Sequence, residues 1–597
     1  MKVADFIFKF LLGKGVENAF MISGGQAMFL VDALYQNRDK INTICTHHEQ
    51  AAGMAAEAYG RITGKLGVAL VTAGPGAVNV INGVVGGWTD SSPMMIISGQ
   101  SALSYVQYQE KTKIRQHGIQ GINIKPLVES ITKYFVTVDD PSKILYYMQK
   151  AYYLATSGRP GPVWIDVPLD VQKMEVPTYL LEEFIAPIDI TYDKSLKRQL
   201  SNTLELISGS KRPIFIVGQG IRIAHAIDEL NEVITTLNIP VLTSRLGIDI
   251  IHSDNRLYVG RPGNYGERSA NFAIQNADLI IAIGCRLASA LAGFDPQNFG
   301  RYAKKVVVDI DNKELEKPGI IIDIKINSDA KIFLKEMLKQ ITTIKKQDYS
   351  EWVEQCNNWK KRYPVVLESY KEEKPVNSYY FTDKLSDIAT KDDMILVDTG
   401  SCFHVACQTW KIKKGQRFLT TGGISSMGYW AAGIGACIAN NKKRTVVITG
   451  DGSLQMNIQE FATIKHNNLP IKVFIFNNNG YLLIRQTQTN FMEGRLFGEG
   501  PKTGVWCPDS LKIANAYGIK GVRIDSIDNI EEKIKEVLDY DGPVICDVMT
   551  PEWQLIIPRV SSEKKPDDTI ISKPLEDMYP FLDREEFKKN MIIKPID

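Results

Sequence analysis

Acidic and amide side chains follow two neighbouring predicted strands in the segment VITGDGSLQMNIQEFATIKHNNLPIKVFIFNNNGY, residues 447–481. The runs RTVVIT and IKVFIF predict buried parallel strands, and the stretch SLQMNIQEFATIKHN between them predicts a helix. Asp451 and the cluster Asn477–Asn479 are then expected at the carboxyl ends of adjacent strands, where open α/β sheets bind ligands. A carboxylate and an amide oxygen, together with phosphate and water, suit an octahedral Mg²⁺ ion. The segment therefore predicts a metal and phosphate site.

Two glycines flank Asp451 and support this interpretation. Gly450 and Gly452 let the backbone approach a ligand closely, and the following helix N-terminus favours an anion. The alternative is that Asp451 caps the helix and the asparagines form a turn, which would be the better interpretation of GDGS alone. The asparagine cluster at the neighbouring strand end favours the metal site instead. Neither the dinucleotide fingerprint nor the P-loop spacing is matched, the latter failing in YGRITGKLG.

The composition is that of a globular protein with several domains. The 597 residues are too many for one core, and three domains are expected. A net charge of +2 gives no argument for a nucleic-acid or membrane partner. Eight cysteines without a CxxC pair suit reduced thiols. The N-terminal MKVADFIFKFLLGKGVENAF fits an amphipathic helix better than a signal peptide, and no apolar run reaches the length of a membrane span, so a cytoplasmic protein is predicted.

Three blocks alternate β-rich runs with helical patterns, which predicts an α/β fold with parallel sheets flanked by helices. The predicted domains cover residues 1–172, 190–342 and 375–555, and a tail covers 556–597. A polar linker joins the first two, and the charged helical stretch DYSEWVEQCNNWKKRYPVVLESYKEEKP leads to the third. The first and third blocks could share one fold. The tail is expected to lie over the surface or over the active site.

The first motif resembles the thiamine diphosphate motif of enzymes that use this cofactor, because Asn478 follows Asp451 by 27 positions. The resemblance implies that the Asp451 and Asn478 side chains and the Gly480 carbonyl bind Mg²⁺. The diphosphate would bridge the metal and the helix N-terminus, where the matching residues are Gly450, Gly452 and Ser453.

A second motif, INTICTHHEQAAGMAAEAYGRITG, resembles the pyrimidine-domain signature of the same enzymes. It implies that Glu49 is catalytic and meets ring nitrogen N1′ of the cofactor, favouring the tautomer that removes the thiazolium C2 proton. Without the first motif, the better interpretation of Glu49 would be an acidic residue that stabilises the positive N-terminal end of a helix dipole. Paired with the first motif, the catalytic interpretation is favoured. Neither His47 nor His48 is assigned a catalytic role.

Longer stretches resemble the acetolactate synthase branch of these enzymes, among them VTAGPGAVNVINGVVGGWTDSSPMMIISGQ, GRPGPVWIDVPLDV and SSMGYWAAGIGACIA. The resemblance covers about residues 1–560 and implies pyrimidine, central and diphosphate domains. It also implies active sites between two subunits of a homodimer or homotetramer, with Glu49 from one and Asp451 from the other. Further positions matched to the cofactor are Gly400, Ser401, His404, Ser425 and Met427. The loop DTGSCFH departs from the family at Cys402 and Phe403.

The same resemblance implies decarboxylation of pyruvate and transfer of the two-carbon unit to a keto acceptor. The substrate-side positions are Gln120, in a loop that departs from the family, Leu483 and Thr487. Thr487 stands where the family has a tryptophan, and Arg485 and Gln486 add donors, so a larger or more polar acceptor is predicted. The chain, including its tail, resembles acetolactate synthase relatives of surface-polysaccharide pathways, some of which add a two-carbon unit to a nucleotide-linked keto sugar. Acetolactate formation from two pyruvates and simple decarboxylation are the alternatives.

Acetolactate synthases also hold a non-redox FAD in the central domain, and VGQGI, RPGNYG and IGCRL resemble parts of that site. The matching residues are Gly218, Gly220, Gly263 and Arg286, whereas Ala290 replaces the family's second arginine. Strand-end turns and a solvent-facing arginine are the alternative, so FAD stays open. A nicotinamide dehydrogenase would leave Glu49 and Asp451 unexplained, and a catalytically silent relative would be expected to lose them.

Overall fold

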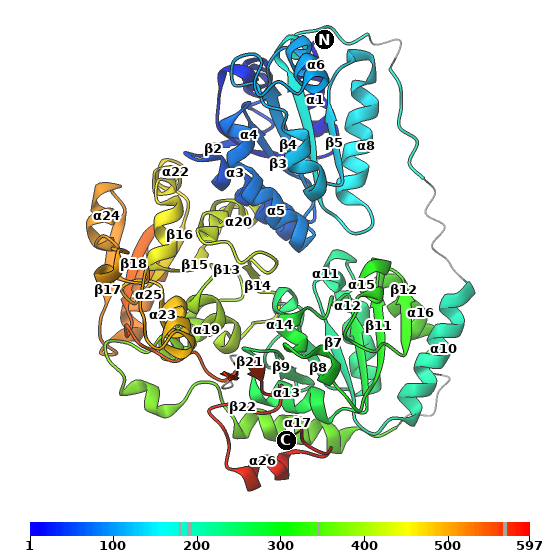
Figure 1. Cartoon of the computed structure of the whole chain (residues 1–597), viewed down its shortest axis with the longest axis vertical. Coiled ribbons are helices and arrows are strands. Elements are labelled where there is room, and N and C mark those ends of the chain that lie inside the picture. The colour runs from blue at the N-terminus through cyan, green and yellow to red at the C-terminus, as the bar shows by residue number, and fades with distance from the viewer. Residues whose placement is uncertain (178–180, 188–193, 343–346, 565–566, 568–569, 597) are drawn as a thin grey trace.

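The computed structural model describes residues 1–177, 181–187, 194–342, 347–564, 567 and 570–596 (Figure 1). It contains three parallel sheets of six strands each, which confirms the predicted α/β fold. The predicted start of the central domain at residue 190 and part of the linker before it lie outside the described residues. No described helix has the length and apolar character that a membrane span requires.

The first and third sheets have the same connectivity, as expected for related folds. Their orders are β2-β1-β3-β4-β6-β5 and β14-β13-β15-β16-β18-β17. The first is made of β1 (Asn18–Met21), β2 (Asn42–Cys45), β3 (Gly67–Val71), β4 (Met94–Gln100), β5 (Tyr134–Thr137) and β6 (Pro162–Pro168). The third is made of β13 (Met394–Val397), β14 (Arg417–Thr420), β15 (Thr445–Gly450), β16 (Ile471–Asn477), β17 (Lys520–Ile524) and β18 (Val544–Met549).

The central sheet has the order β12-β11-β10-β7-β8-β9. The chain adds strands on one side of β7 up to β9 and then on the other side from β10, so the strand order reverses between β7 and β10, which pair in parallel. Such a reversal opens a crevice at the carboxyl ends of the two strands. The strands are β7 (Pro213–Val217), β8 (Val241–Thr243), β9 (Tyr258–Gly260), β10 (Leu279–Ile283), β11 (Lys304–Asp309) and β12 (Ile324–Asn327). The predicted charged helix is α17 (Ser350–Arg362), which packs on the central domain through the buried Trp352 and Trp359.

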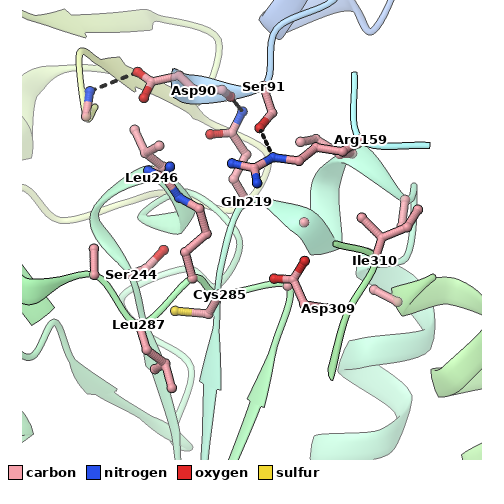
Figure 2. Close-up of a pocket in the computed structure, with 18 of the residues that line it drawn as sticks. Asp90, Ser91, Arg159, Gln219, Ser244, Leu246, Cys285, Leu287, Asp309 and Ile310 are labelled. Carbon is pink, nitrogen blue, oxygen red and sulfur yellow. Dashed lines mark hydrogen bonds between the residues drawn. The ribbon is translucent and has the colours of Figure 1, made fainter. Parts of the chain in front are cut away.

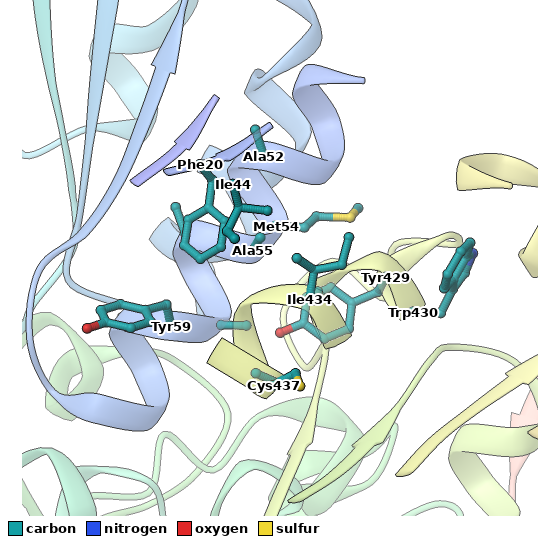
Figure 3. Close-up of a cluster of buried hydrophobic side chains, with 14 of the residues drawn as sticks. Phe20, Ile44, Ala52, Met54, Ala55, Tyr59, Tyr429, Trp430, Ile434 and Cys437 are labelled. Atoms are coloured by element: carbon teal, nitrogen blue, oxygen red, sulfur yellow. The ribbon is translucent and has the colours of Figure 1, made fainter. Parts of the chain in front are cut away.

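Helix α3 (Glu49–Thr63) joins the first domain to the third (Figure 3). It packs against α5 (Ile81–Asp90) and α20 (Gly433–Ala439), and small residues let the backbones approach. A Cβ atom on Gly435 would lie 1.9 Å from the carbonyl oxygen of Ala55. This close packing fixes the helix that begins at Glu49 relative to the third domain.

A buried cluster of charges, the interdomain charge cluster, lies beside this contact. The guanidinium of Arg61 bonds to Glu57 Oε1 at 3.3 Å and Asp90 Oδ2 at 3.1 Å, and it donates to the carbonyl of Thr420. The Tyr429 hydroxyl donates to Glu57 Oε2, while the Gly422 N–H donates to Asp90 Oδ2. The cluster therefore ties the loop 420–429 of the third domain to the first domain.

The tail crosses the central domain. Its strand β22 (Met578–Tyr579) and its helix α26 (Arg584–Asn590) lie near α13 (Arg268–Asn276), and its strand β19 (Arg559–Val560) pairs with β22 (Figure 1). Asn271 donates to the carbonyl of Leu575 at 2.8 Å, and the buried Glu576 accepts from Gln275 at 2.7 Å. The expectation that the tail lies over the surface holds for these residues, and their contacts anchor it to the central domain.

Candidate active site

Asp451 lies where the sequence predicts it, at the carboxyl edge of the third sheet. Strands β15 and β16 pair in parallel, with Gly450 opposite Phe476. The single helix predicted between them is divided into α21 (Asp451–Leu454), a 3₁₀ turn and α22 (Glu460–His466), and it begins at Asp451 itself. The two oxygens of the buried carboxyl accept the N–H groups of Gly452 and Gly480, both at 2.9 Å. Burial nevertheless raises the pKa of Asp451 to about 7.

Asn478 is also buried, and its amide oxygen has no hydrogen-bond partner among the residues that the structure describes. Buried polar atoms are nearly always satisfied, so an orphaned oxygen beside a buried carboxylate indicates a missing ligand. Gly480 follows with φ of 131°, and a Cβ atom there would lie 2.1 Å from the carbonyl oxygen of Glu499. A carboxylate, a free amide oxygen and a backbone carbonyl fit Mg²⁺, with phosphate and water completing its coordination.

Asp398, at the end of β13, is a residue of this site that the sequence reasoning missed. It is fully buried and accepts the hydroxyls of Ser453 at 2.6 Å and Thr449 at 2.9 Å. The Ser453 hydroxyl in turn accepts the N–H of Gly428 at 2.8 Å. The side chain of Ser453 is therefore committed to the protein, and its backbone is what remains for a ligand. The signal for Asp398 was an acid directly after the apolar run MILV.

The predicted cofactor loops surround this edge. Gly400, with φ of 90°, precedes α19 (Ser401–Thr409). Ser425 is exposed with φ of 49°, and Met427 is partly buried just before Gly428. His404 packs its ring on Tyr265 of the central domain at 4.0 Å between centroids, and burial with the nearby Arg245 lowers its pKa to about 3. The imidazole of His404 is therefore neutral.

Glu49 and Gln120 lie together on the first domain, beside the turn Gly74–Gly76. Glu49 is buried, its Oε2 accepts from Asn79 Nδ2 at 3.0 Å, and its Oε1 would lie 3.3 Å from a Cβ atom on Gly76. Gln120, with φ of 58°, is exposed, and its backbone lies against Gly74. The carboxyl of Glu49 is thus held by Asn79 on one side and lies beside Gly76, which has no side chain.

Helix α23 (Leu482–Phe491) carries the positions predicted to meet the acceptor. Leu483 is partly buried, and Thr487 is exposed, with its hydroxyl bonded to the Leu483 carbonyl at 2.9 Å. Arg485 and Gln486 differ from the expectation that they supply donors to an acceptor. Both are buried, Gln486 donates to the carbonyl of Gln554 at 2.6 Å, and Arg485 is bonded within its own domain.

A cavity of about 180 Å³ occupies the crevice of the central sheet (Figure 2). Gly220 and Arg286 line it, with Arg159 and Asp90 of the first domain and Asp309 at the end of β11. Burial raises the pKa of Asp309. Gly218 and Gly263 are not in the lining: a Cβ atom on either would lie within 2.3 Å of a neighbouring carbonyl oxygen, so they serve packing. Ala290 lines the cavity where the family has its second arginine.

Comparison with known proteins places these domains in one family. Residues 1–127, 200–337 and 398–548 match the N-terminal TPP binding, central and C-terminal TPP binding domains of thiamine pyrophosphate enzymes, TPP being the same cofactor as thiamine diphosphate. The probable acetolactate synthase large subunit of Methanococcus aeolicus is 33% identical, with 92% of each chain covered. The acetolactate synthase large subunit of Cyanidium caldarium is 33% identical, with 92% of this chain and 93% of the relative covered. The chloroplastic acetolactate synthase of Arabidopsis thaliana is 32% identical, with 94% and 83% covered. The chain is a thiamine pyrophosphate enzyme of the acetolactate synthase type.

Proposed function

We propose that the protein is a Mg²⁺- and thiamine diphosphate-dependent carboligase that decarboxylates pyruvate and transfers the two-carbon unit to a keto acceptor. The observation that carries the proposal is the unpartnered amide oxygen of Asn478 beside the buried carboxyl of Asp451. Asp451, Asn478 and the Gly480 carbonyl would hold the metal, which binds the diphosphate. Gly450, Gly452, Ser453, Gly400 and Ser401 would contribute backbone groups near the phosphates. When bound, the cofactor would supply a nucleophilic carbon for the keto group of a 2-keto acid and an electron sink for the bond broken on decarboxylation.

Glu49 would exchange a proton with the cofactor's aminopyrimidine ring. Asn79 orients its carboxyl, and burial excludes water from the proton transfer. Glu49 and Asp451 are carried by different domains, and we assign the complete site to two copies of the chain in a homodimer or larger homo-oligomer. Met427 would support the bent form of the cofactor, and Gln120 would face the substrate.

The acceptor is either a second pyruvate or a larger keto compound. The names of the relatives favour pyruvate. The exposed Thr487 at the position of the family's tryptophan favours a larger acceptor, such as a nucleotide-linked keto sugar. Two exposed aromatic side chains on the following loop, Phe497 (81%) and Trp506 (72%), would offer stacking surfaces to such a molecule.

Product analysis tests the acceptor. The purified enzyme is incubated with pyruvate alone and with pyruvate plus a nucleotide-linked keto sugar, and CO₂, acetolactate and acetaldehyde are measured. Fast acetolactate formation from pyruvate alone would contradict the large acceptor. CO₂ release that rises with the sugar, together with a product two carbons heavier, would support it. Acetaldehyde as the main product in both mixtures would identify a decarboxylase.

FAD is a second cofactor proposal, supported by the cavity of the central domain. The crevice lies at the reversal of strand order, and Arg159, Arg245 and Arg286 supply positive charge for a diphosphate. Its 180 Å³ is below the roughly 300–1,000 Å³ of cofactor pockets, so the whole FAD would require neighbouring side chains to move. A yellow purified protein that releases FAD on denaturation would support the proposal, and a colourless one would contradict it.

A further inference from the structure

The guanidinium of Arg485 contacts the segment that carries the proposed metal ligands. Its Nη1 donates to the carbonyl of Asn478 at 3.3 Å, and its Nη2 donates to the carbonyl of Asn479 at 3.1 Å. The same Nη1 also bonds the carbonyl of Glu552, and Nε bonds Glu499 Oε2 at 2.5 Å. All three nitrogens are therefore engaged, and the side chain is buried. A guanidinium is a planar fork, so it can hold two successive carbonyls in a fixed orientation.

The opposite side of the second of these peptide units faces Asp451. The N–H of Gly480 donates to Asp451 Oδ2 at 2.9 Å, whereas the N–H of Asn479 donates to Asn477 Oδ1 at 3.4 Å. In a trans peptide the C=O and the N–H point in opposite directions. The peptide unit that joins Asn479 and Gly480 is thus held between the Arg485 guanidinium on one side and the Asp451 carboxyl on the other, and Arg485 also holds the carbonyl of the preceding unit.

We propose that Arg485 is a positioning residue that fixes the Asn478–Gly480 segment for binding of Mg²⁺. The inference rests on the proposed function, since it assigns the metal to Asp451, Asn478 and Gly480. The side chain of Asn478 is attached beside the peptide units that Arg485 immobilises, and the carbonyl of Gly480 belongs to the next unit, whose N–H donates to the carbonyl of Glu499. With these units fixed, the ligands are held in place before the metal arrives, and no ordering is required on binding.

Glu499 makes this arrangement compatible with a cation. A lone guanidinium beside the site would repel Mg²⁺, and the carboxylate of Glu499 offsets its charge. Glu499 also secures the segment through its own backbone, because its carbonyl accepts the N–H of Tyr481 at 2.7 Å. The pair is therefore expected to act as a unit. The Arg485 guanidinium orients the Asn478–Gly480 segment, and the Glu499 carboxylate neutralises the charge of the guanidinium.

The test compares Mg²⁺ binding by the wild-type full-length protein and four variants, titrated by calorimetry in excess thiamine diphosphate. Arg485→Lys keeps the charge but loses the fork, and Glu499→Gln keeps the fork but loses the charge. Arg495→Lys and Glu493→Gln are matched controls, because they alter an exposed ion pair in which Arg495 lies ten positions after Arg485 and Glu493 six positions before Glu499. The melting temperature of each apo-protein is measured in parallel.

The expected result is a Kd for Mg²⁺ that rises about 10- to 100-fold in Arg485→Lys and about tenfold in Glu499→Gln. The controls should stay within about twofold of the wild type. Lower melting temperatures with an unchanged Kd in both test variants would show a merely structural role and overturn the inference. If one variant does not fold, the Kd of the other decides. A wild type that binds no Mg²⁺ with thiamine diphosphate would overturn the proposed function as well, which distinguishes the two failures.

Discussion

Asn478 keeps a polar atom buried without a partner, which costs stability in the apo-protein. The desolvation of an unsatisfied amide oxygen costs about 1–3 kcal/mol. Asp451 is comparable, because burial raises its pKa to about 7 and so disfavours the charged form that a metal needs. Such costs are typical of residues retained for ligand binding rather than for folding.

Asn478→Ala is therefore expected to separate stability from binding. The substitution removes the orphaned oxygen, so the melting temperature of the apo-protein should stay the same or rise. Mg²⁺-dependent binding of thiamine diphosphate should be lost. Thermal unfolding and calorimetric titration measure the two effects. A clear loss of apo-protein stability with binding retained would contradict this account of Asn478.

A pH-dependent contribution to stability is expected from Asp166, a fully buried carboxyl in the first domain. Ser98 donates to it at 2.6 Å and Gln100 at 3.2 Å, yet burial raises its pKa to about 7. The folded protein thus holds a proton that the unfolded chain releases near pH 4, and stability from this group falls as pH rises between the two values. Asp166→Asn should gain about 2 kcal/mol relative to the wild type between pH 5 and pH 8. Melting temperatures of both proteins across this range measure the difference, and parallel curves would contradict the expectation.

At the scale of elements, one helix and one cluster fix the first and third domains of a single chain relative to each other. Helix α3 carries Glu49 at its first position and Arg61 near its end. His47, just before it, donates its N–H to Glu460 of α22 at 3.0 Å, so both ends of the helix are bound to the third domain. The interdomain charge cluster fixes the loop that carries Met427.

Arg61→Met should destabilise the protein severely, because it leaves Glu57 and Asp90 buried without their cation. Loss of one partner from a buried charge cluster costs about 3–5 kcal/mol. Lys65→Met, four residues further along, removes a cation from an exposed pair with Glu17 and should cost less than about 0.5 kcal/mol. Thermal unfolding of both variants tests this contrast. Equally small losses of stability in both would contradict a role of the cluster in holding the first and third domains together.

The elements that were predictable are those with a periodic signal. Apolar runs such as RTVVIT and IKVFIF define parallel strands, and strand order then brings Asp451 and Asn478 to one edge. The division of the helix after Asp451 into α21, a 3₁₀ turn and α22 was not predictable, because the residues of all three parts are compatible with one continuous helix. The role of Arg485 was misjudged because a buried arginine and an exposed one look alike in sequence. Asp398 was missed because its partners are distant along the chain.

At the scale of the whole molecule, two domains of one topology flank a doubly wound central domain. The repeated order of the first and third sheets lets one present Glu49 and the other the proposed metal ligands. Each copy of the chain carries both halves, so pairing of two copies would generate two complete sites. Closed symmetric dimers are the commonest solution for such repeated surfaces.

Co-expression of two inactive variants tests this assembly. Glu49→Gln and Asp451→Ala chains with different tags are expected to form a heterodimer with one intact and one doubly altered site. Its activity should be about half that of the wild type, whereas each variant alone should be inactive. An inactive heterodimer would instead place Glu49 and Asp451 of one chain in the same site.

The central claim is that the edge of the third sheet binds thiamine diphosphate through Mg²⁺. Calorimetric titration of the apo-protein with the cofactor, with and without Mg²⁺, tests it most directly when the wild type is compared with Asp451→Ala. The account predicts tight binding by the wild type that requires Mg²⁺ and is lost in the variant. Absence of binding by the wild type, or equal binding without the metal, would contradict it.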